Sequence, residues 1–173
     1  MPDITNYPLT LPEVKSFLRI DSDYAYEDDL LKMLVISETL YYEKRLNLGL
    51  VAGIDRVQYV SSPYCCGRNF IRLNYAPVQA DSIRAFSHEA AIQGENLIIQ
   101  QTPYPIVFGV PYMGYIQYKQ AGLNPFPEDL KRAILMRIAF AYDNRTGKLD
   151  SSVKDIYAAV NPDTLAAQYS RNF

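Results

Sequence analysis

The chain has 173 residues, 49% of them hydrophobic and 21% charged, so it carries enough apolar material for a folded domain and is unlike a disordered chain. Its formal net charge is −2, whereas proteins that grip nucleic-acid phosphates carry a basic surplus, so DNA wrapping or sequence reading is not expected. The two cysteines are adjacent, which excludes a disulfide framework and a paired-cysteine zinc motif.

The first predicted element is a helix over residues 11–19. Thr10 can cap it, because Pro12 lies in the first turn and Glu13 stands three residues after the cap. An acidic turn follows, and Glu27 opens the acidic start of the next element, where the positive end of a helix dipole favours carboxylates. Two antiparallel helices joined by an acidic turn are therefore expected at the start of the chain.

The second predicted element is a long helix over residues 26–47. Its large apolar side chains recur at helical spacing: Leu30, Leu31, Leu34, Val35, Tyr41, Tyr42 and Leu46. Gly49 and Gly53 interrupt this pattern and end the helical region.

Between residues 56 and 122 the pattern becomes that of strands broken by turn residues. The candidate strands are 56–60, 69–75, 82–86, 91–92, 97–100 and 115–119. Residues 93–96 predict a hairpin turn between the fourth and the fifth of these strands. Pro103, Pro105 and Pro111 predict that the segment before the last strand is irregular or lies at a sheet edge.

Helical periodicity returns at Pro127, a residue type that suits the first position of a helix. The apolar stripe of this third long helix, predicted over 127–145, contains Leu130, Ile134, Leu135, Ile138, Ala141 and Tyr142. A last short helix is predicted over 164–169, and the chain after it ends on Phe173.

The predicted fold is α+β, with a mainly helical body of two N-terminal helices and a long C-terminal helix, a β-rich insert and an extended C-terminal tail. A single domain over 1–173 is expected, because no linker divides the sequence. Its parts are the N-terminal helices in 1–50, the insert in 56–122, the helix in 126–146 and the C-terminal segment 150–173. The long helices are expected to pack together through Phe17, Leu18, Leu30, Leu34, Leu135 and Ile138.

No catalytic set is predicted. Ser87, His88 and Glu89 offer a hydroxyl, an imidazole and a carboxylate, but neighbours on a strand point to opposite faces, whereas a catalytic triad needs converging side chains. No glycine-rich phosphate loop, apolar run of membrane-spanning length or signal peptide is present in the sequence. We therefore expect no enzyme activity, no cofactor and no membrane contact.

The acidic turn offers carboxylates that could hold Ca²⁺: Asp21, Asp23, Glu27, Asp28 and Asp29. It lacks the glycine and the ligand order of an EF-hand loop. A solvated helix start is the expected role of these acids, and no metal ligand is predicted.

Four segments stand in an order that matches a known family. They are 11–21, with the pattern L-x-E-x-K-x-x-L-R-I-D, the acidic helix start 27–31, the strand and Pro-Val step 71–78, and the helix start 127–135, with the pattern P-x-D-L-K-x-A-I-L. In this order and spacing the chain resembles the tailed-phage head-to-tail connector proteins, also called adaptor or head-completion proteins.

The resemblance implies a structural virion protein. Such proteins form a ring, usually a dodecamer, under the portal protein, extend the DNA channel, and offer a docking surface to the tail or to a stopper or tail-completion protein. Genomic DNA would pass through the channel without specific binding. The expected location is the head-tail interface of the virion, after assembly in the host bacterial cytoplasm.

In related adaptors the C-terminal segment reaches the portal protein. The resemblance therefore makes Leu165, Tyr169 and Phe173 candidates for docking into a groove of the portal, with Arg171 as a charged anchor. A frayed terminus is the alternative.

Two other interpretations remain open. A tail-completion or terminator protein also forms a ring, but it is usually dominated by strands with one helix. A nucleic-acid-binding helical module would need a basic helix face, whereas the cations of this chain are scattered among acids. The 15 tyrosines and 7 phenylalanines favour an assembly protein, because tyrosine is enriched where chains meet.

Overall fold

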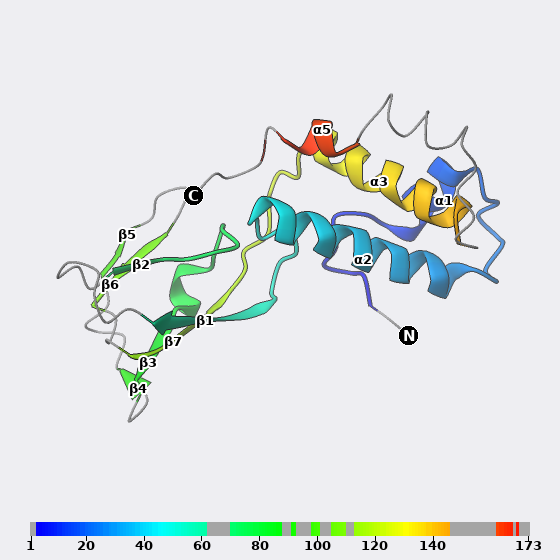
Figure 1. Cartoon of the computed structure of the whole chain (residues 1–173). Coiled ribbons are helices and arrows are strands. Elements are labelled where there is room, and N and C mark those ends of the chain that lie inside the picture. The colour runs from blue at the N-terminus through cyan, green and yellow to red at the C-terminus, as the bar shows by residue number, and fades with distance from the viewer. Residues whose placement is uncertain are drawn as a thin grey trace. The chain divides into compact units, whose positions relative to one another are not determined.

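The computed structural model describes residues 3–61, 70–87, 91–92, 98–100, 105–109, 113–145, 162–167 and 169. The chain divides into two compact units (Figure 1). The helical unit comprises Met1–Asn47 and Asn124–Phe173, and the β unit comprises Leu48–Leu123, so the β unit is inserted between two helical parts of the sequence. The predicted α+β class is confirmed, while most of the expected extended tail lies outside the described residues.

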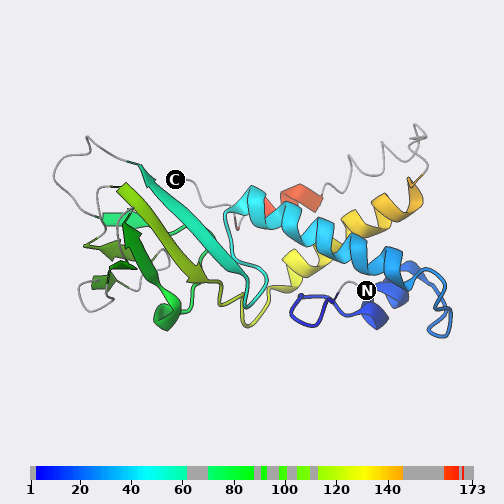
Figure 2. The same ribbon diagram turned by 90° about the horizontal axis from the view of Figure 1, so that it is seen from below.

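The helical unit contains α1 (Leu11–Leu18), α2 (Asp28–Leu46), α3 (Glu128–Asp143) and α5 (Pro162–Ala167). Its two long helices, α2 and α3, lie side by side in both views (Figures 1 and 2). The helices predicted over 11–19, 26–47 and 127–145 are confirmed, with ends that shift by at most two residues.

Local signals explain where the helices begin and end. The Glu13 carboxylate accepts a hydrogen bond from the backbone N–H of Thr10 at 2.8 Å, which is half of the predicted capping box. Arg19 and Asn47 take left-handed conformations, with φ of 58° and 52°, and end α1 and α2. Pro127 lies just before α3 rather than at its first position.

The core of the helical unit follows the predicted apolar stripes of α2 and α3 only in part. The fully buried apolar residues are Leu9, Val14, Leu31, Val35, Tyr42, Leu46, Leu130, Ala133, Ile134, Ile138 and Ala166. Of the six residues predicted to pack the helices together, only Ile138 is among them. Phe17 is 43% exposed, so its assignment to the core was wrong. Four others are only half-buried: Leu18, Leu30, Leu34 and Leu135.

The physical reason lies in α2, which carries apolar residues on two sides. Leu31 and Val35 mark one side, and Leu30 and Leu34 mark a second side one residue away in phase. A period of 3.6 residues is satisfied by either stripe, so periodicity alone does not say which one faces α1 and α3.

The described residues of the β unit form seven short strands. They are β1 (Asp55–Ser61), β2 (Phe70–Arg72), β3 (Arg84–Ser87), β4 (Ala91–Ile92), β5 (Ile98–Gln100), β6 (Ile106–Phe108) and β7 (Met113–Lys119). They form two antiparallel sheets, in the orders β1-β7-β3-β4 and β2-β6-β5. The first and last predicted strands correspond to β1 and β7, which pair along their whole lengths.

The two sheets share one core. It contains Leu73, Ile83, Ala85, Val107, Ile116 and Tyr118. Burial raises the pKa of the Tyr118 hydroxyl, although nearby Arg56 acts in the opposite direction. The hydroxyl donates to the carbonyl of Asn74 at 2.6 Å, which satisfies the one polar atom that this side chain brings into the core.

Two expectations for the strands were wrong. The segments 91–92 and 98–100 do not form a hairpin, because β4 pairs with β3 and β5 pairs with β6 in the other sheet. The proline-rich segment holds β6, which lies at the centre of its sheet rather than at an edge. A strand of only three residues fits between Pro105 and Pro111, and the carbonyl of Pro105 still accepts a hydrogen bond from the backbone of Leu73 at 2.9 Å.

Candidate interaction surfaces

The turn between α1 and α2 is held in place by one buried cation. Lys15 is only 5% exposed, and its Nζ donates to the carbonyls of Ser22 at 3.1 Å and Tyr24 at 2.9 Å. The same nitrogen pairs with Asp28 Oδ1 at 2.7 Å. The ammonium group therefore has three oxygen neighbours, two carbonyls that accept hydrogen bonds and one carboxylate that forms an ion pair. The turn is thus fixed to the helical unit while it presents Tyr26, which is 91% exposed.

The acids of this turn are largely occupied by protein partners. Glu27 accepts a hydrogen bond from the Tyr142 hydroxyl and pairs with Arg145 at 2.6 Å. The hydrogen bond from Tyr142, followed by that from Arg145, lowers the pKa of Glu27. Within the described part of the chain, no group of three or more His, Cys, Asp or Glu residues could hold a metal ion. These contacts tie the start of α2 to the end of α3.

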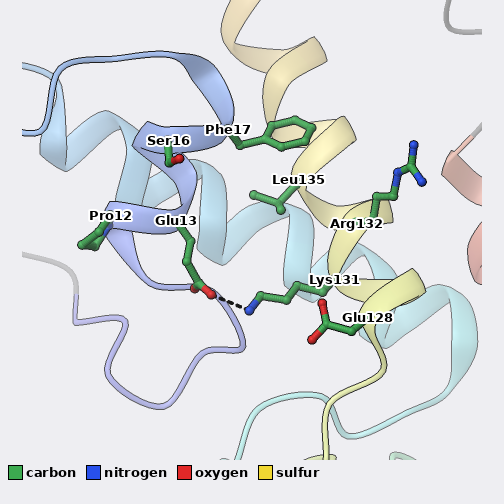
Figure 3. A pocket seen from close by; sticks show the side chains of 8 residues that line it. All are labelled: Pro12, Glu13, Ser16, Phe17, Glu128, Lys131, Arg132 and Leu135. Carbon is green, nitrogen blue, oxygen red and sulfur yellow. Dashed lines mark hydrogen bonds and ion pairs between the residues drawn. The ribbon is translucent and has the colours of Figure 1, made fainter.

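A groove of about 490 Å³ lies between α1 and α3 (Figure 3). Its lining residues are Pro12, Glu13, Ser16, Phe17, Glu128, Lys131, Arg132 and Leu135. Phe17 from α1 and Leu135 from α3 point toward each other and form its apolar part. Lys131 bridges the two helices through an ion pair with Glu13.

This ion pair stays charged at neutral pH. Burial pushes the pKa of Glu13 upward, but hydrogen bonds from Lys131 and Thr10 outweigh it and hold the pKa below its usual value. The hydrogen bond that Lys131 donates to Glu13 raises the pKa of Lys131 in return. The pair therefore links α1 to α3 at this end of the groove.

The short helix α5 packs on α2 and α3 of its own chain. Ala166 is fully buried there. Asp163 lies 3.4 Å from Arg45 and accepts a hydrogen bond from the Tyr41 hydroxyl at 3.5 Å. Arg137 of α3 lies 3.7 Å above the Tyr41 ring, so the surface that receives α5 is itself braced by a cation–π contact.

The predicted docking residues lie at and beyond this helix. Leu165 belongs to α5, and Tyr169 follows it in a turn and is half-buried. The side chain of Leu165, together with Arg171 and Phe173, lies outside the described residues. Docking of this segment onto a partner therefore stays a prediction. Cys65, Cys66, His88 and Glu89 also lie outside the described residues.

The sequence reasoning missed an aromatic row on the β unit. Tyr59, Tyr115 and Phe86 stand opposite one another on β1, β7 and β3. Phe86 stacks on Tyr115 with ring centroids 4.8 Å apart, and Tyr59 is 75% exposed. The alternation of side chains along predicted strands could have indicated their common face, but the strand partners could not be read from it.

It also assigned Leu30 and Leu34, which belong to a second stripe of α2, to the core, and it did not single out Met33 between them. This outer stripe, formed by Leu30, Met33 and Leu34, remains at the surface, and Met33 is 62% exposed. None of the helices among the described residues has the length and apolar character needed to cross a membrane.

No protein-family model and no curated protein matches the sequence. Solved structures do match over the whole chain, and three of them come from gene transfer agent (GTA) particles. They are the neck of an empty GTA particle computed with C6 symmetry (16% identity, TM-score 0.70), the virion of a native GTA particle (14%, 0.71) and the neck of a native GTA particle computed with C12 symmetry (15%, 0.66).

Each match covers 100% of this chain and 94% of the other chain. The agreement therefore includes the helical unit and the inserted β unit, although fewer than one residue in five is identical. The chain has the fold of a chain found in the neck of gene transfer agent particles, as its resemblance to head-to-tail connector proteins led us to expect.

Proposed function

We propose that this protein is a structural component of the neck of a phage-like particle, where it forms a ring under the portal, connects the head to the tail and extends the DNA channel. The observation that carries the proposal is the match of fold over 100% of the chain to a neck chain. A shared fold alone does not assign a function. Here it agrees with the four sequence segments that resemble connector proteins, which were identified independently of it.

The charge of the chain suits a channel wall. A ring of copies that each carry a net charge of −2 would repel DNA phosphates weakly and let the genome pass. Two of the matching chains come from necks computed with C6 and C12 symmetry, which is the repetition that a ring requires. We therefore propose a dodecamer, which combines with the portal protein on one side and with a tail, stopper or tail-completion protein on the other.

The portal contact is proposed for the C-terminal segment, with Leu165, Tyr169, Arg171 and Phe173 as docking residues. The packing of α5 refines this proposal. Because Ala166 is buried in the helical unit, α5 would serve as a fixed base and the residues after it would reach the portal. The cation and two aromatic rings of that segment suit a groove that is both apolar and acidic.

The experiment is electron microscopy of portal-bearing heads incubated with the full-length protein and with a variant truncated after Tyr169. The full-length protein should add a ring at the portal vertex, and the truncated protein should co-sediment with heads much less. Circular dichroism should show the same melting curve for both, because α5 is kept. A full-length protein that never adds density at the portal vertex would overturn the proposed function. Equal co-sedimentation of the two proteins would overturn only the anchoring role of the last four residues.

A further inference from the structure

Among the described residues, the helical unit presents two apolar surfaces on which no other described element packs, and they lie on opposite sides of it. The outer stripe on α2 is centred on Met33, which lies roughly half a turn around the helix from the buried residues Leu31 and Val35. The buried side of α2 faces α1 and α3. The outer stripe therefore points away from both of these helices.

The second surface is the groove between α1 and α3. Its apolar part is formed by Phe17, which is 43% exposed, and the half-buried Leu135. Figure 3 shows these two side chains in front, with α2 running behind α1 and α3. The groove and the outer stripe are thus separated by the thickness of the helical unit.

We propose that the outer stripe of one copy packs into the groove of the next copy. The inference rests on the proposed ring and names the contact that would build it. A groove between two helices receives a third helix through ridges that fit grooves, and α2 presents a ridge of Leu30, Met33 and Leu34 at helical spacing. The ion pair between Glu13 and Lys131 keeps the receiving groove preformed.

A second copy of this chain is the occupant that explains both surfaces at once. A portal or tail protein seated on one surface would leave the other exposed, whereas one contact between copies covers both. Two different patches on opposite sides of a subunit give a heterologous, head-to-tail contact, which closes into a ring when the rotation between subunits allows it. A self-complementary patch would give a closed dimer instead.

The charges agree with one orientation of the contact. The exposed acids Asp21, Asp23 and Asp29 lie near the N-terminal end of the outer stripe. The rim of the groove carries exposed Arg132 and, one turn earlier in α3, exposed Glu128. The acidic end of the stripe therefore belongs next to Arg132 and away from Glu128, and charge fixes the register while the apolar side chains supply the affinity.

The test traps the contact between full-length chains by disulfide formation. Both native cysteines are replaced by serine, and Met33→Cys and Phe17→Cys are placed in separate chains. Oxidation of the mixture should give a covalent heterodimer in several-fold excess over either chain oxidised alone. The matched control pairs Met33→Cys with Tyr59→Cys, because Tyr59 is 75% exposed but belongs to the β unit. Trapping detects even transient contacts, so a protein that is monomeric in dilute solution remains testable.

A second arm uses Met33→Asp and Phe17→Asp at high concentration in analytical ultracentrifugation. Each variant alone should stay monomeric, and their equimolar mixture should give dimers, because one intact stripe then meets one intact groove. Homodimers of the Met33→Cys chain, or a heterodimer yield equal to the control, would overturn the inference. This test can fail without the proposed function failing. If the Met33→Asp variant still forms a ring at the portal vertex, the proposed function stands and the proposed contact between copies is wrong.

Discussion

At the scale of single residues, the turn before α2 depends on Lys15. Its one ammonium group organises the turn that leads into α2, through two carbonyls and the carboxylate of Asp28. The side chain is almost fully buried, so removing it would leave three polar partners without a donor in a poorly solvated site.

We therefore expect Lys15→Met to lower the free energy of unfolding by about 2–4 kcal/mol, as for other buried charge pairs that lose one partner. The matched control is Lys32→Met, which removes a cation whose pair with Asp29 at 3.5 Å lies on the surface of α2. That change should cost less than about 1 kcal/mol. Urea denaturation of both variants measures the difference, and equal losses would show that the buried lysine is not what holds the turn.

Glu27 is expected to make the stability of the fold depend on pH in the acidic range. Its pKa is lowered in the folded state by the hydrogen bonds from Tyr142 and Arg145. A carboxyl with a depressed folded pKa stabilises the fold above its unfolded value of 4.5, and this contribution is lost as the pH falls through the folded pKa. We expect the melting temperature of the wild type to exceed that of Glu27→Gln at neutral pH. The two melting temperatures should converge as the pH falls through the folded pKa of Glu27. A gap that stays constant on acidification would contradict this assignment.

At the scale of elements, α2 shows what sequence can and cannot specify. Its ends follow from local signals, namely acids at the start and a left-handed Asn47 at the end, and they were predicted within two residues. Its buried face was not predictable, because Leu30 and Leu34 are as apolar as Leu31 and Val35. Only tertiary packing distinguishes the two stripes, and the stripe that packing leaves over is the one we assign to a neighbouring copy.

Alanine substitutions on the two faces of α2 test which face is buried. Leu31→Ala, which removes a fully buried side chain, should lower the free energy of unfolding by about 2–5 kcal/mol through lost burial and a cavity. Met33→Ala, two residues away on the outer stripe, should change it by no more than about 0.5 kcal/mol in the monomer. Chemical denaturation at low protein concentration checks both. The reverse order of effects would place the outer stripe in the core.

The strands were harder to predict than the helices for a related reason. β4 and β5 lie on either side of the predicted turn at 93–96, which is outside the described residues, but a turn signal does not name the partner of each strand. β4 pairs with β3 and β5 pairs with β6, so both choices depend on contacts made through the shared core rather than on the local sequence. The aromatic row of Tyr59, Tyr115 and Phe86 was missed for the same reason.

At the scale of the whole molecule, the groove could not be derived from the sequence. Its walls come from α1 and α3, whose residues Glu13 and Lys131 are separated by 118 positions in the chain. The order of helices, insert and helix was readable, and so was the resemblance to connector proteins, because both depend on linear patterns. Surfaces that join distant segments become visible only once the chain is folded.

The two units each have a core of their own, so we expect them to respond separately to damage. Gly49 is buried in the β unit, and a Cβ at this position would collide with the backbone carbonyl oxygen of Tyr75. Gly49→Ala should therefore destabilise the β unit, because backbone cannot move aside as a flexible side chain can. The helical unit should retain its melting transition, followed by far-ultraviolet circular dichroism. The part of the near-ultraviolet tyrosine signal that comes from Tyr59, Tyr115 and Tyr118 of the β unit should be lost at a lower temperature.

The matched control is Gly53→Ala, in the same segment. A Cβ on Gly53 would have no other atom within 4 Å, but the backbone there has a φ of 79°, so this change tests backbone strain without collision and should cost about 1–2 kcal/mol. A larger loss in Gly49→Ala than in Gly53→Ala isolates the steric term. If the helical signal and the tyrosine signal of the β unit fall together in Gly49→Ala, the two units unfold as one cooperative block, and the expectation of separate unfolding is wrong.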